Sequence, residues 1–307
     1  MYVLETHDLC KKYKEHLVVN NVNMHIEEGD IYGFVGENGA GKTTILRLIT
    51  GLANPTSGKF TLFGVDSDSD EINIAKEKLS GIVETVSLNK SMNALDNLKL
   101  QCLITNTKKS DEELIQLIEK VGLNYQEIKT KKVGNFSLGM RQRIGIACIM
   151  ISNPKFVLLD EPMNGLDPQG FIDVREVILK LKEEGVTFLI SSHILSELDK
   201  ICNKIGFISH GVLLDEISIE DLHAKSRRRI EIESDDPARL LGKLTIELHL
   251  NDCELENDKV IIFDEVDIND VIDVISREKL RINNFTLKQD TIEDYYINLI
   301  GRGVKHE

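Results

Sequence analysis

The sequence has no apolar run of the roughly 18 to 20 residues that a membrane-spanning helix requires. Its first residues, MYVLETHDLCKKYK, also lack the apolar core of a secretory signal peptide. With 41% hydrophobic and 29% charged residues, the composition is that of a globular protein without low-complexity tracts. We therefore expect that the chain of 307 residues does not itself cross a bilayer and forms one large domain and one small domain.

Cysteine is scarce and scattered. The five cysteines are Cys10, Cys102, Cys148, Cys202 and Cys253. They are odd in number, lie far apart and show no metal-ligand spacing, which indicates reduced and mostly packed thiols. Reduced thiols favour a location in the cytoplasm.

Basic residues are fewer than acidic residues. The formal net charge is −14, and residues 218–307 hold 21 acidic but only 13 basic side chains. This balance argues against broad nucleic-acid binding, which depends on surplus lysine and arginine to neutralise phosphates. The one basic cluster is Lys225 with Arg227, Arg228 and Arg229. It is interpreted either as a solvated linker or as a contact with phospholipid or a partner.

The most informative stretch is GENGAGKTT, residues 36–44. It follows an apolar run of strand length and precedes a segment with apolar residues at helical spacing. Gly36, Gly41, Lys42 and Thr43 match the pattern G-x-x-x-x-G-K-[ST]. The glycines permit a tight loop whose backbone N–H groups point inward, and the next helix adds its positive end, so the loop can wrap a polyphosphate.

This match predicts a polyphosphate-binding loop. Its residues are Gly36, Glu37, Asn38, Gly39, Ala40, Gly41, Lys42, Thr43 and Thr44. We expect Lys42 to contact the β- and γ-phosphates and the Thr43 hydroxyl to bind Mg²⁺.

A second motif, KFVLLDEP (155–162), is a buried strand that ends in two acids. A carboxylate at the carboxyl end of an interior strand lies where open α/β sheets bind ligands, and it is costly to bury without a cation. Asp160 is therefore the expected Mg²⁺ partner. Glu161 is then free to act as a base on the water that attacks the γ-phosphate, although a plain strand-end charge is the alternative.

Three further stretches each have a simple structural explanation when taken alone. NFSLGMRQRIGIACIM (135–150) places Ser137 at a helix N-cap with Gly139 just inside the helix. MNGLDPQG (163–170) is a turn before a helix, and FLISSHIL (188–195) is a buried strand with His193 just beyond its end.

Together, in this order and spacing, the motifs of residues 1 to about 216 resemble the nucleotide-binding subunit of ATP-binding-cassette (ABC) transporters. The resemblance makes residues 36–44 the Walker A loop, residues 156–160 the Walker B strand and residues 164–167 the D-loop. It implies catalytic roles for Lys42, for Glu161 as the base, and for His193 as the switch histidine that contacts the γ-phosphate.

The same resemblance assigns two further contacts to ATP. The stretch FSLGM (136–140) is similar to the LSGGQ signature: Ser137 and Gly139 are kept, whereas Leu138 and Met140 replace a glycine and the glutamine. Tyr13 looks like the aromatic residue that stacks on adenine. The alternative for Tyr13 is a core position in the first strand pair.

Glu84, in GIVETVSLNKSM (81–92), departs from the family, which has glutamine in the loop that joins the ATP-binding core to the helical subdomain. Its carboxylate can accept from a Mg²⁺-bound water but repels phosphate when the metal is absent. We therefore count Glu84 with Thr43 and Asp160 as predicted metal residues. With the pattern FSxGMxQRxGIA, it makes the chain similar to the bacitracin-resistance, lantibiotic-immunity and sodium-export ATPases.

The expected fold is α/β: a P-loop NTPase of the ABC ATPase type over residues 1–216. It has a mainly parallel core sheet, an antiparallel β-subdomain and a helical subdomain at about 86–150. The capping box of Ser110 and Glu113 predicts a helix that Gly122 closes. Strands near 156–160, 186–191 and 205–209 alternate with helices near 168–183 and 194–203.

Residues 217–307 are predicted to form a small α+β domain. The segments RRIEIES, PARLLGKL, TIELHL, KVIIFDE, INDVIDVISREKL and RINNFTLKQ give the order β-α-β-β-α-β of a ferredoxin-like fold, followed by a last helix, TIEDYYINLIG. Their acids are interpreted as a solvated surface, or as a dimerisation or regulatory surface.

On the family pattern, one chain with a single Walker A loop and a single signature does not complete an ATP site. Two copies facing head to tail would hold ATP and Mg²⁺ between the Walker motifs of one chain and Ser137 and Gly139 of the other. We expect a cytoplasmic ATPase, held at the inner face of the membrane by a separate transmembrane permease that docks near Glu84. Export of antimicrobial peptides or drugs is the suggested role.

Two alternatives remain at this point. One is a soluble ABC-type switch acting on ribosomes or DNA, although such chains usually have two cassettes or a long coiled-coil insertion. The other is an immunity or regulatory module that binds ATP and a membrane partner but hydrolyses ATP slowly.

Overall fold

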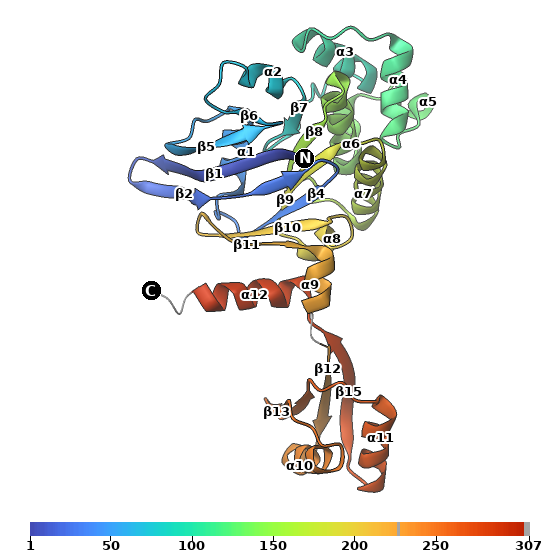
Figure 1. The fold of residues 1–307 in the computed structure, drawn as a ribbon. Helices are drawn as coiled ribbons and strands as arrows, with labels where there is room; N and C mark the ends of the chain where they lie inside the picture. Colours follow the sequence, from blue (N-terminus) through green and yellow to red (C-terminus); the bar gives the residue numbers. More distant parts are fainter. Residues whose placement is uncertain (226–227, 304–307) are drawn as a thin grey trace. The chain divides into compact units, whose positions relative to one another are not determined.

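The computed structural model describes residues 1–225 and 228–303 of the chain (Figure 1). Arg227, one member of the basic cluster, lies outside the described residues. The chain divides into two compact units, which consist mainly of Met1–Glu220 and of Asp221–Gly301. Each unit encloses a hydrophobic core of its own.

A six-stranded sheet forms the centre of the first unit. Its inner strands pair in parallel, and the edge strand β11 pairs antiparallel with β10. Every residue of β4, β8 and β9 is buried, because both faces of a parallel sheet are covered. In spatial order the strands are β11 (Val212–Ser218), β10 (Lys204–Ser209), β4 (Ile31–Val35), β9 (Thr187–Ser192), β8 (Phe156–Asp160) and β7 (Leu79–Ile82).

An antiparallel sheet packs against the first helix, α1 (Lys42–Thr50). Leu4, Val19 and Ile26 of this sheet share a core with Ile45 and Ile49 of the helix. The predicted antiparallel β-subdomain is thereby confirmed. Its strands are β2 (His16–Val22), β1 (Tyr2–Tyr13), β5 (Ser57–Leu62) and β6 (Val65–Asp66), with β3 (His25–Glu27) also paired to β1.

A group of helices lies between β7 and β8 in the sequence and stands at the upper right of Figure 1. The predicted capping box is present: Ser110 Oγ accepts from Glu113 N, and the Glu113 carboxylate accepts from Ser110 N. Helix α6 packs against α3, α4 and α7. The elements are α3 (Ala94–Ile104), α4 (Asp111–Lys120), α5 (Tyr125–Ile128), the 3₁₀ turns Val133–Asn135 and Met150–Ser152, and α6 (Leu138–Ile149).

Helix α7 (Pro168–Glu183) agrees with the helix predicted at 168–183. Asp167 caps it by accepting from Gly170 N at 3.0 Å, and proline suits the first helical position because its missing N–H is not needed there. The helix predicted at 194–203 is shorter, since α8 covers only Leu195–Leu198. After α8 the backbone closes in tight turns, because the chain must return to start β10.

The second unit has a four-stranded antiparallel sheet in the order β13-β14-β12-β15. The chain order β-α-β-β-α-β, followed by a last helix, confirms the predicted ferredoxin-like arrangement. Its elements are β12 (Arg228–Ser234), α10 (Pro237–Glu247), β13 (Cys253–Glu256), β14 (Lys259–Ile262), α11 (Ile268–Arg277), β15 (Ile282–Gln289) and α12 (Ile292–Gly303); α9 (Ile219–Lys225) precedes them.

The second strand of this unit was predicted in the wrong place. TIELHL does not form it, because α10 continues to Glu247 and the strand begins only at Cys253. Leu244 is fully buried at helical spacing from Leu240, and the Thr245 hydroxyl donates to Leu241 O at 2.8 Å. Burial of this helical face therefore outweighs the alternating pattern of the sequence.

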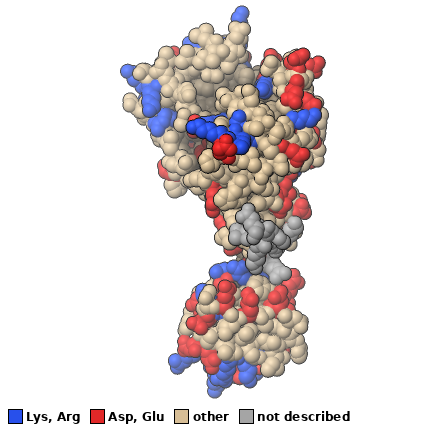
Figure 2. All heavy atoms as spheres, turned by 90° about the vertical axis from the view of Figure 1, so that its left-hand side faces the viewer, with Lys and Arg blue, Asp and Glu red and all other residues tan. Residues whose placement is uncertain are grey.

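Charged side chains of the second unit largely pair with one another. Arg229 bonds with Glu231 at 2.9 Å and with Asp290, and Lys288 lies 2.8 Å from Glu231. Figure 2 accordingly shows acidic and basic side chains interspersed on the face drawn. Arg229 of the basic cluster is therefore engaged within its own sheet.

Within residues 1–225 and 228–303, no helix combines the length and the apolar character that a bilayer crossing requires.

Candidate active site

The loop Gly36–Thr44 joins the carboxyl end of β4 to the start of α1. Gly41 has φ +108°, and a Cβ there would lie 2.8 Å from Val18 O, so this position requires glycine. Glu37, Asn38 and Gly39 form the exposed tip of the loop, while Ala40 is buried. The β10–β11 turn supports the loop, because Gly211 N donates to Ala40 O at 3.0 Å.

Lys42 is bent back over this loop. Its side chain is only 6% exposed, and its ammonium donates to Gly36 O and, at 3.3 Å, to Glu37 O. The ammonium also lies 3.3 Å from Glu161 Oε1. A cation with backbone carbonyls and one carboxylate as partners can exchange these contacts for phosphate oxygens.

Asp160 accepts hydrogen bonds from α1, from the loop after β7 and from β9. Its Oδ2 accepts from the Thr43 hydroxyl of α1 at 2.8 Å and from Glu84 N at 3.3 Å. Its Oδ1 accepts from the Ser191 hydroxyl of β9 at 2.5 Å. These bonds offset the cost of burying a carboxylate that is 6% exposed.

Glu161 stands in the left-handed backbone region, with φ +48°. Its N–H donates to Ser191 O at 3.1 Å and to Ser191 Oγ at 2.9 Å, which holds this strained conformation. Its Oε2 lies 2.8 Å from His193 Nδ1. Its Oε1 is buried and within ion-pair distance of Lys42 but makes no hydrogen bond to any described residue, so this oxygen is able to accept a proton.

The donor set at Thr43 and Asp160 fits Mg²⁺. A hydroxyl and a carboxylate oxygen stand 2.8 Å apart, and both are hard ligands. Within residues 1–225 and 228–303, no group of three or more His, Cys, Asp or Glu side chains is arranged to hold a metal alone. Mg²⁺ usually binds one or two protein oxygens together with substrate phosphates, so the two side chains suffice.

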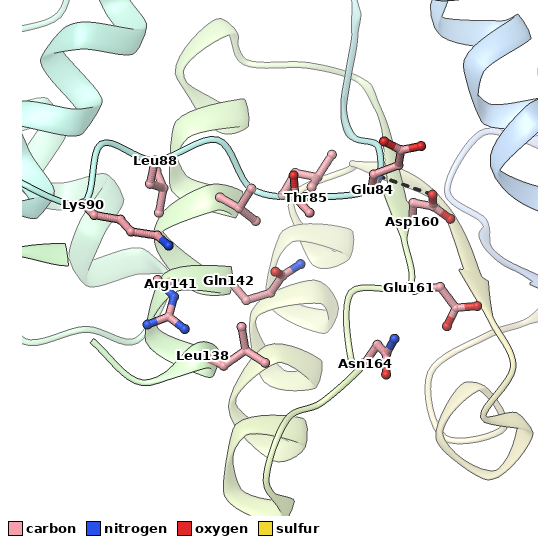
Figure 3. A pocket seen from close by; sticks show the side chains of 12 residues that line it. Glu84, Thr85, Leu88, Lys90, Leu138, Arg141, Gln142, Asp160, Glu161 and Asn164 are labelled. Carbon is pink, nitrogen blue, oxygen red and sulfur yellow. Dashed lines mark hydrogen bonds between the residues drawn. The ribbon is translucent and has the colours of Figure 1, made fainter. Parts of the chain in front are cut away.

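Glu84 does not extend its carboxylate toward this metal position. Figure 3 shows the side chain pointing away from Asp160 and Glu161, while its backbone N–H bonds to Asp160. The carboxylate instead accepts from Arg47 Nη2. A direct metal contact from Glu84 therefore needs a change of side-chain conformation and stays a prediction.

A cavity of about 350 Å³ opens beside these carboxylates (Figure 3). Its walls come from the loop after β7, the start of α6 and the segment after β8. The lining residues are Ile82, Glu84, Thr85, Val86, Leu88, Lys90, Leu138, Arg141, Gln142, Asp160, Glu161 and Asn164.

Comparison with known proteins shows the family of the chain. The family model described as ABC transporter matches residues 19–164. The bacitracin transport ATP-binding protein BcrA of Enterococcus faecalis is 36% identical over 98% of this chain and 97% of its own length. The chain belongs to the ABC transporter family. The lantibiotic transport ATP-binding protein SrtF of Streptococcus pyogenes is 42% identical over 70% of this chain and 90% of its own length.

Solved ABC cassettes have the same fold. A structure of an ATP-binding subunit of an ABC transporter matches with a TM-score of 0.63 and 25% identity, over 73% of this chain and 92% of that one. A dimeric cassette bound to ADP and Pi matches with a TM-score of 0.62 and 24% identity, over 70% of this chain and 98% of that one. The predicted family and fold are confirmed, and the chain is an ABC ATPase that binds adenine nucleotide.

The structure brings the Walker A and Walker B residues of this ABC ATPase together with His193. Tyr13 lies at the end of β1, outside that group, and is 41% exposed. Lys11 Nζ lies 4.9 Å from its ring centroid. An exposed ring is unlike a core tyrosine, but stacking of Tyr13 on adenine stays a prediction.

The signature residues start another helix. Ser137 caps α6 by accepting from Met140 N at 3.1 Å, and a Cβ at Gly139 would lie 3.3 Å from Gly170 Cα. Helix α6 packs against α3, α4, α7 and β7, whereas α1 packs against β2, β7 and β8. Ser137 and Gly139 thus stand at the start of a helix whose neighbours are mainly the helices α3, α4 and α7.

Two functional candidates were missed in the sequence. Ser191 bonds to both Asp160 and Glu161, and the available signal is its place in β9 only two residues before His193. Arg47 bonds to Glu84, and it lies four residues after Thr43 on α1. Nothing in the sequence links Arg47 to a loop 37 residues away.

Proposed function

We propose that this ABC ATPase is the ATP- and Mg²⁺-dependent subunit of an exporter whose membrane-spanning part is a separate polypeptide, and that the exporter confers resistance to peptide antibiotics. The relatives named for bacitracin and lantibiotic transport support this proposal, since they cover most of the chain. The ATPase would then lie at the cytoplasmic face of the membrane.

One observation supports the ATPase chemistry most directly: Lys42, Glu161 and His193 meet at the carboxyl ends of parallel strands. Lys42 binds phosphate oxygens, and Glu161 Oε1, released by Lys42, accepts a proton from the attacking water. His193 holds the other oxygen of Glu161 and so orients the carboxylate. Bound between Thr43, Asp160 and the phosphates, Mg²⁺ would neutralise charge that develops during transfer.

A second copy of the chain completes the site in this proposal. Ser137 and Gly139 stand at the start of α6 and, in this proposal, contact the nucleotide held by the Walker residues of the other copy. One related cassette has been solved as a dimer in two structures. An isologous pair gives two identical composite sites, each with Walker residues from one chain and signature residues from the other.

A groove of about 440 Å³ is the proposed docking place for the membrane subunit. Its walls include the loop around Glu84, with Val83 and Thr85, and the face of α6 at Gly145 and Cys148. A Cβ at Gly145 would lie 2.8 Å from Val86 Cγ2, so α6 and the loop approach closely. A segment bound here would touch the loop that bonds to Asp160.

The proposal is tested in the host cells. Deleting the chain should lower the concentration of bacitracin or of a lantibiotic that stops growth, and the wild-type chain should restore resistance. Glu161→Gln, expressed at the same level, should not restore it, because hydrolysis is lost. Unchanged sensitivity of the deletion strain to both classes would contradict the proposed role in resistance.

A further inference from the structure

The ion pair of Arg47 with Glu84 has no role in the site as described so far. Glu84 has φ +70°, a conformation that costs a non-glycine residue about 1 kcal/mol or more and persists only when the surroundings hold it. Two contacts hold it here. Its N–H donates to Asp160 Oδ2, and its carboxylate accepts from Arg47. The backbone thus faces the metal position while the side chain is turned away from it.

These contacts form a closed ring, called the circuit below, which connects Thr43, Asp160, Glu84 and Arg47. Thr43 and Arg47 are four residues apart on α1 and so lie on one face of the helix. Thr43 bonds to Asp160, Asp160 accepts from Glu84 N, and Glu84 pairs with Arg47. The circuit therefore joins the helix of the Walker A motif to the loop after β7 through the metal carboxylate.

The same loop lines two cavities. Thr85, Val86 and Leu88 face both the cavity beside the carboxylates and the groove proposed for docking. Displacement of the loop from the groove side would move the two Glu84 contacts together. A ligand in either cavity could therefore change the position of the Glu84 carboxylate.

The positive charge of Arg47 determines where the Glu84 carboxylate lies. When Arg47 does not pair with it, the Glu84 carboxylate can move closer to the place beside Asp160 and Glu161 where the ATP phosphates are proposed to bind. The carboxylate then repels the phosphates, because both are negatively charged. The side chains of Arg47 and Glu84 are 38% and 54% exposed, so their pairing is weak enough to open. Metal bound near Thr43 and Asp160 would reverse the preference and attract the Glu84 carboxylate.

We propose that Arg47 is a positioning residue that keeps the Glu84 carboxylate outside the ATP site unless Mg²⁺ accompanies the nucleotide. The inference rests on the ATP·Mg²⁺ site proposed above. It predicts that Arg47 sets the ratio of ATP affinity with Mg²⁺ to ATP affinity without it.

The test is equilibrium binding of ATP to the full chain by calorimetry, in EDTA and in excess Mg²⁺. Arg47→Gln should weaken binding in EDTA about three- to tenfold and leave binding in Mg²⁺ equal or tighter, because the released carboxylate repels phosphate but attracts metal. Arg47→Lys, which keeps the charge, should stay within about twofold of wild type. Glu84→Gln should lower the ratio, since it removes the anion.

A double variant and a matched control make the outcome decisive. In the Glu84→Gln background, Arg47→Gln should leave the ratio unchanged. Lys59→Gln breaks another exposed ion pair, Lys59 with Asp66, and should behave as wild type. The inference is overturned if Arg47→Gln leaves the ratio within twofold of wild type, or if it has the same effect without Glu84. If wild-type protein binds no ATP·Mg²⁺, the proposed function itself fails.

Discussion

Lys42 Nζ lies 3.3 Å from Glu161 Oε1, so the phosphate-binding cation and the proposed catalytic base neutralise each other in the structure. The two residues belong to different elements, α1 and the end of β8. A bound γ-phosphate would draw Lys42 away from Glu161, because phosphate offers several strong acceptors. Binding of ATP would therefore release the carboxylate for chemistry.

Lys42→Ala should weaken ATP binding by on the order of 100-fold, because it removes charge-assisted hydrogen bonds to phosphate. Fluorescence titration with a labelled ATP measures this loss. Lys59→Ala, at an exposed position in the same unit, is the control and should bind normally. Wild-type affinity in Lys42→Ala would contradict the phosphate-binding role.

Glu161→Gln should retain ATP but hydrolyse it about 10²- to 10⁴-fold more slowly, since the amide cannot accept the proton. His193→Ala removes the partner at 2.8 Å from Glu161 Oε2 and should slow hydrolysis less, by about tenfold, with ATP affinity within about threefold. Release of phosphate under saturating ATP measures both rates. Normal turnover in Glu161→Gln would show that another group is the base.

Ser191→Ala should lower stability by about 1 to 3 kcal/mol, because Asp160 Oδ1 then lacks a buried donor and Glu161 N loses an acceptor. It should also raise the Mg²⁺ concentration needed for half-maximal hydrolysis. Ser192→Ala is the matched control, since Ser192 is buried on the same strand but bonds only to the local Ile194 N. If both variants changed stability and the Mg²⁺ requirement equally, the positioning role of Ser191 would be contradicted.

The buried thiols provide a prediction about pH. Burial raises the pKa of Cys148 from 9.0 to about 12 and raises that of Cys202 even further. Between pH 9 and 12 the folded chain therefore keeps a proton on Cys148 that the unfolded chain loses, and stability falls as pH rises through that window.

The rate of thiol labelling tests the burial of the same cysteines. At pH 8 in the native chain, the half-buried Cys253 should react first with a disulfide reagent, while Cys148 and Cys202 react only on unfolding. Cys253→Ser should remove the fast phase. Rapid native labelling of Cys148 would contradict its burial.

The sequence was sufficient for features that depend on local chemistry. The glycine pattern at 36–44 predicts a loop between strand and helix, and the acids after an apolar run predict a strand end, because backbone conformation and burial follow from neighbouring residues. The capping box at Ser110 and helix α7 were predicted for the same reason. The order of the ferredoxin-like unit followed from alternating patterns.

Features that depend on long-range packing were not predictable. TIELHL alternates like a strand, but it follows a helix whose buried face extends to Leu244. The ion pair of Arg47 with Glu84 was not predictable, because it joins α1 to a loop 37 residues away. The role of Ser191 also depends on long-range packing, because its two bonds join it to residues 30 and 31 positions away.

The most direct test of the account is the molar mass of Glu161→Gln by light scattering, with and without ATP·Mg²⁺. The chain mass is 34.7 kDa, and we expect a shift from monomer to dimer when ATP·Mg²⁺ is added. Changing Ser137 to a bulky residue, as Ser137→Arg in the same chain, should abolish the shift but not ATP binding. A chain that binds ATP·Mg²⁺ and stays monomeric, or that dimerises regardless of Ser137, would contradict a site shared between two copies.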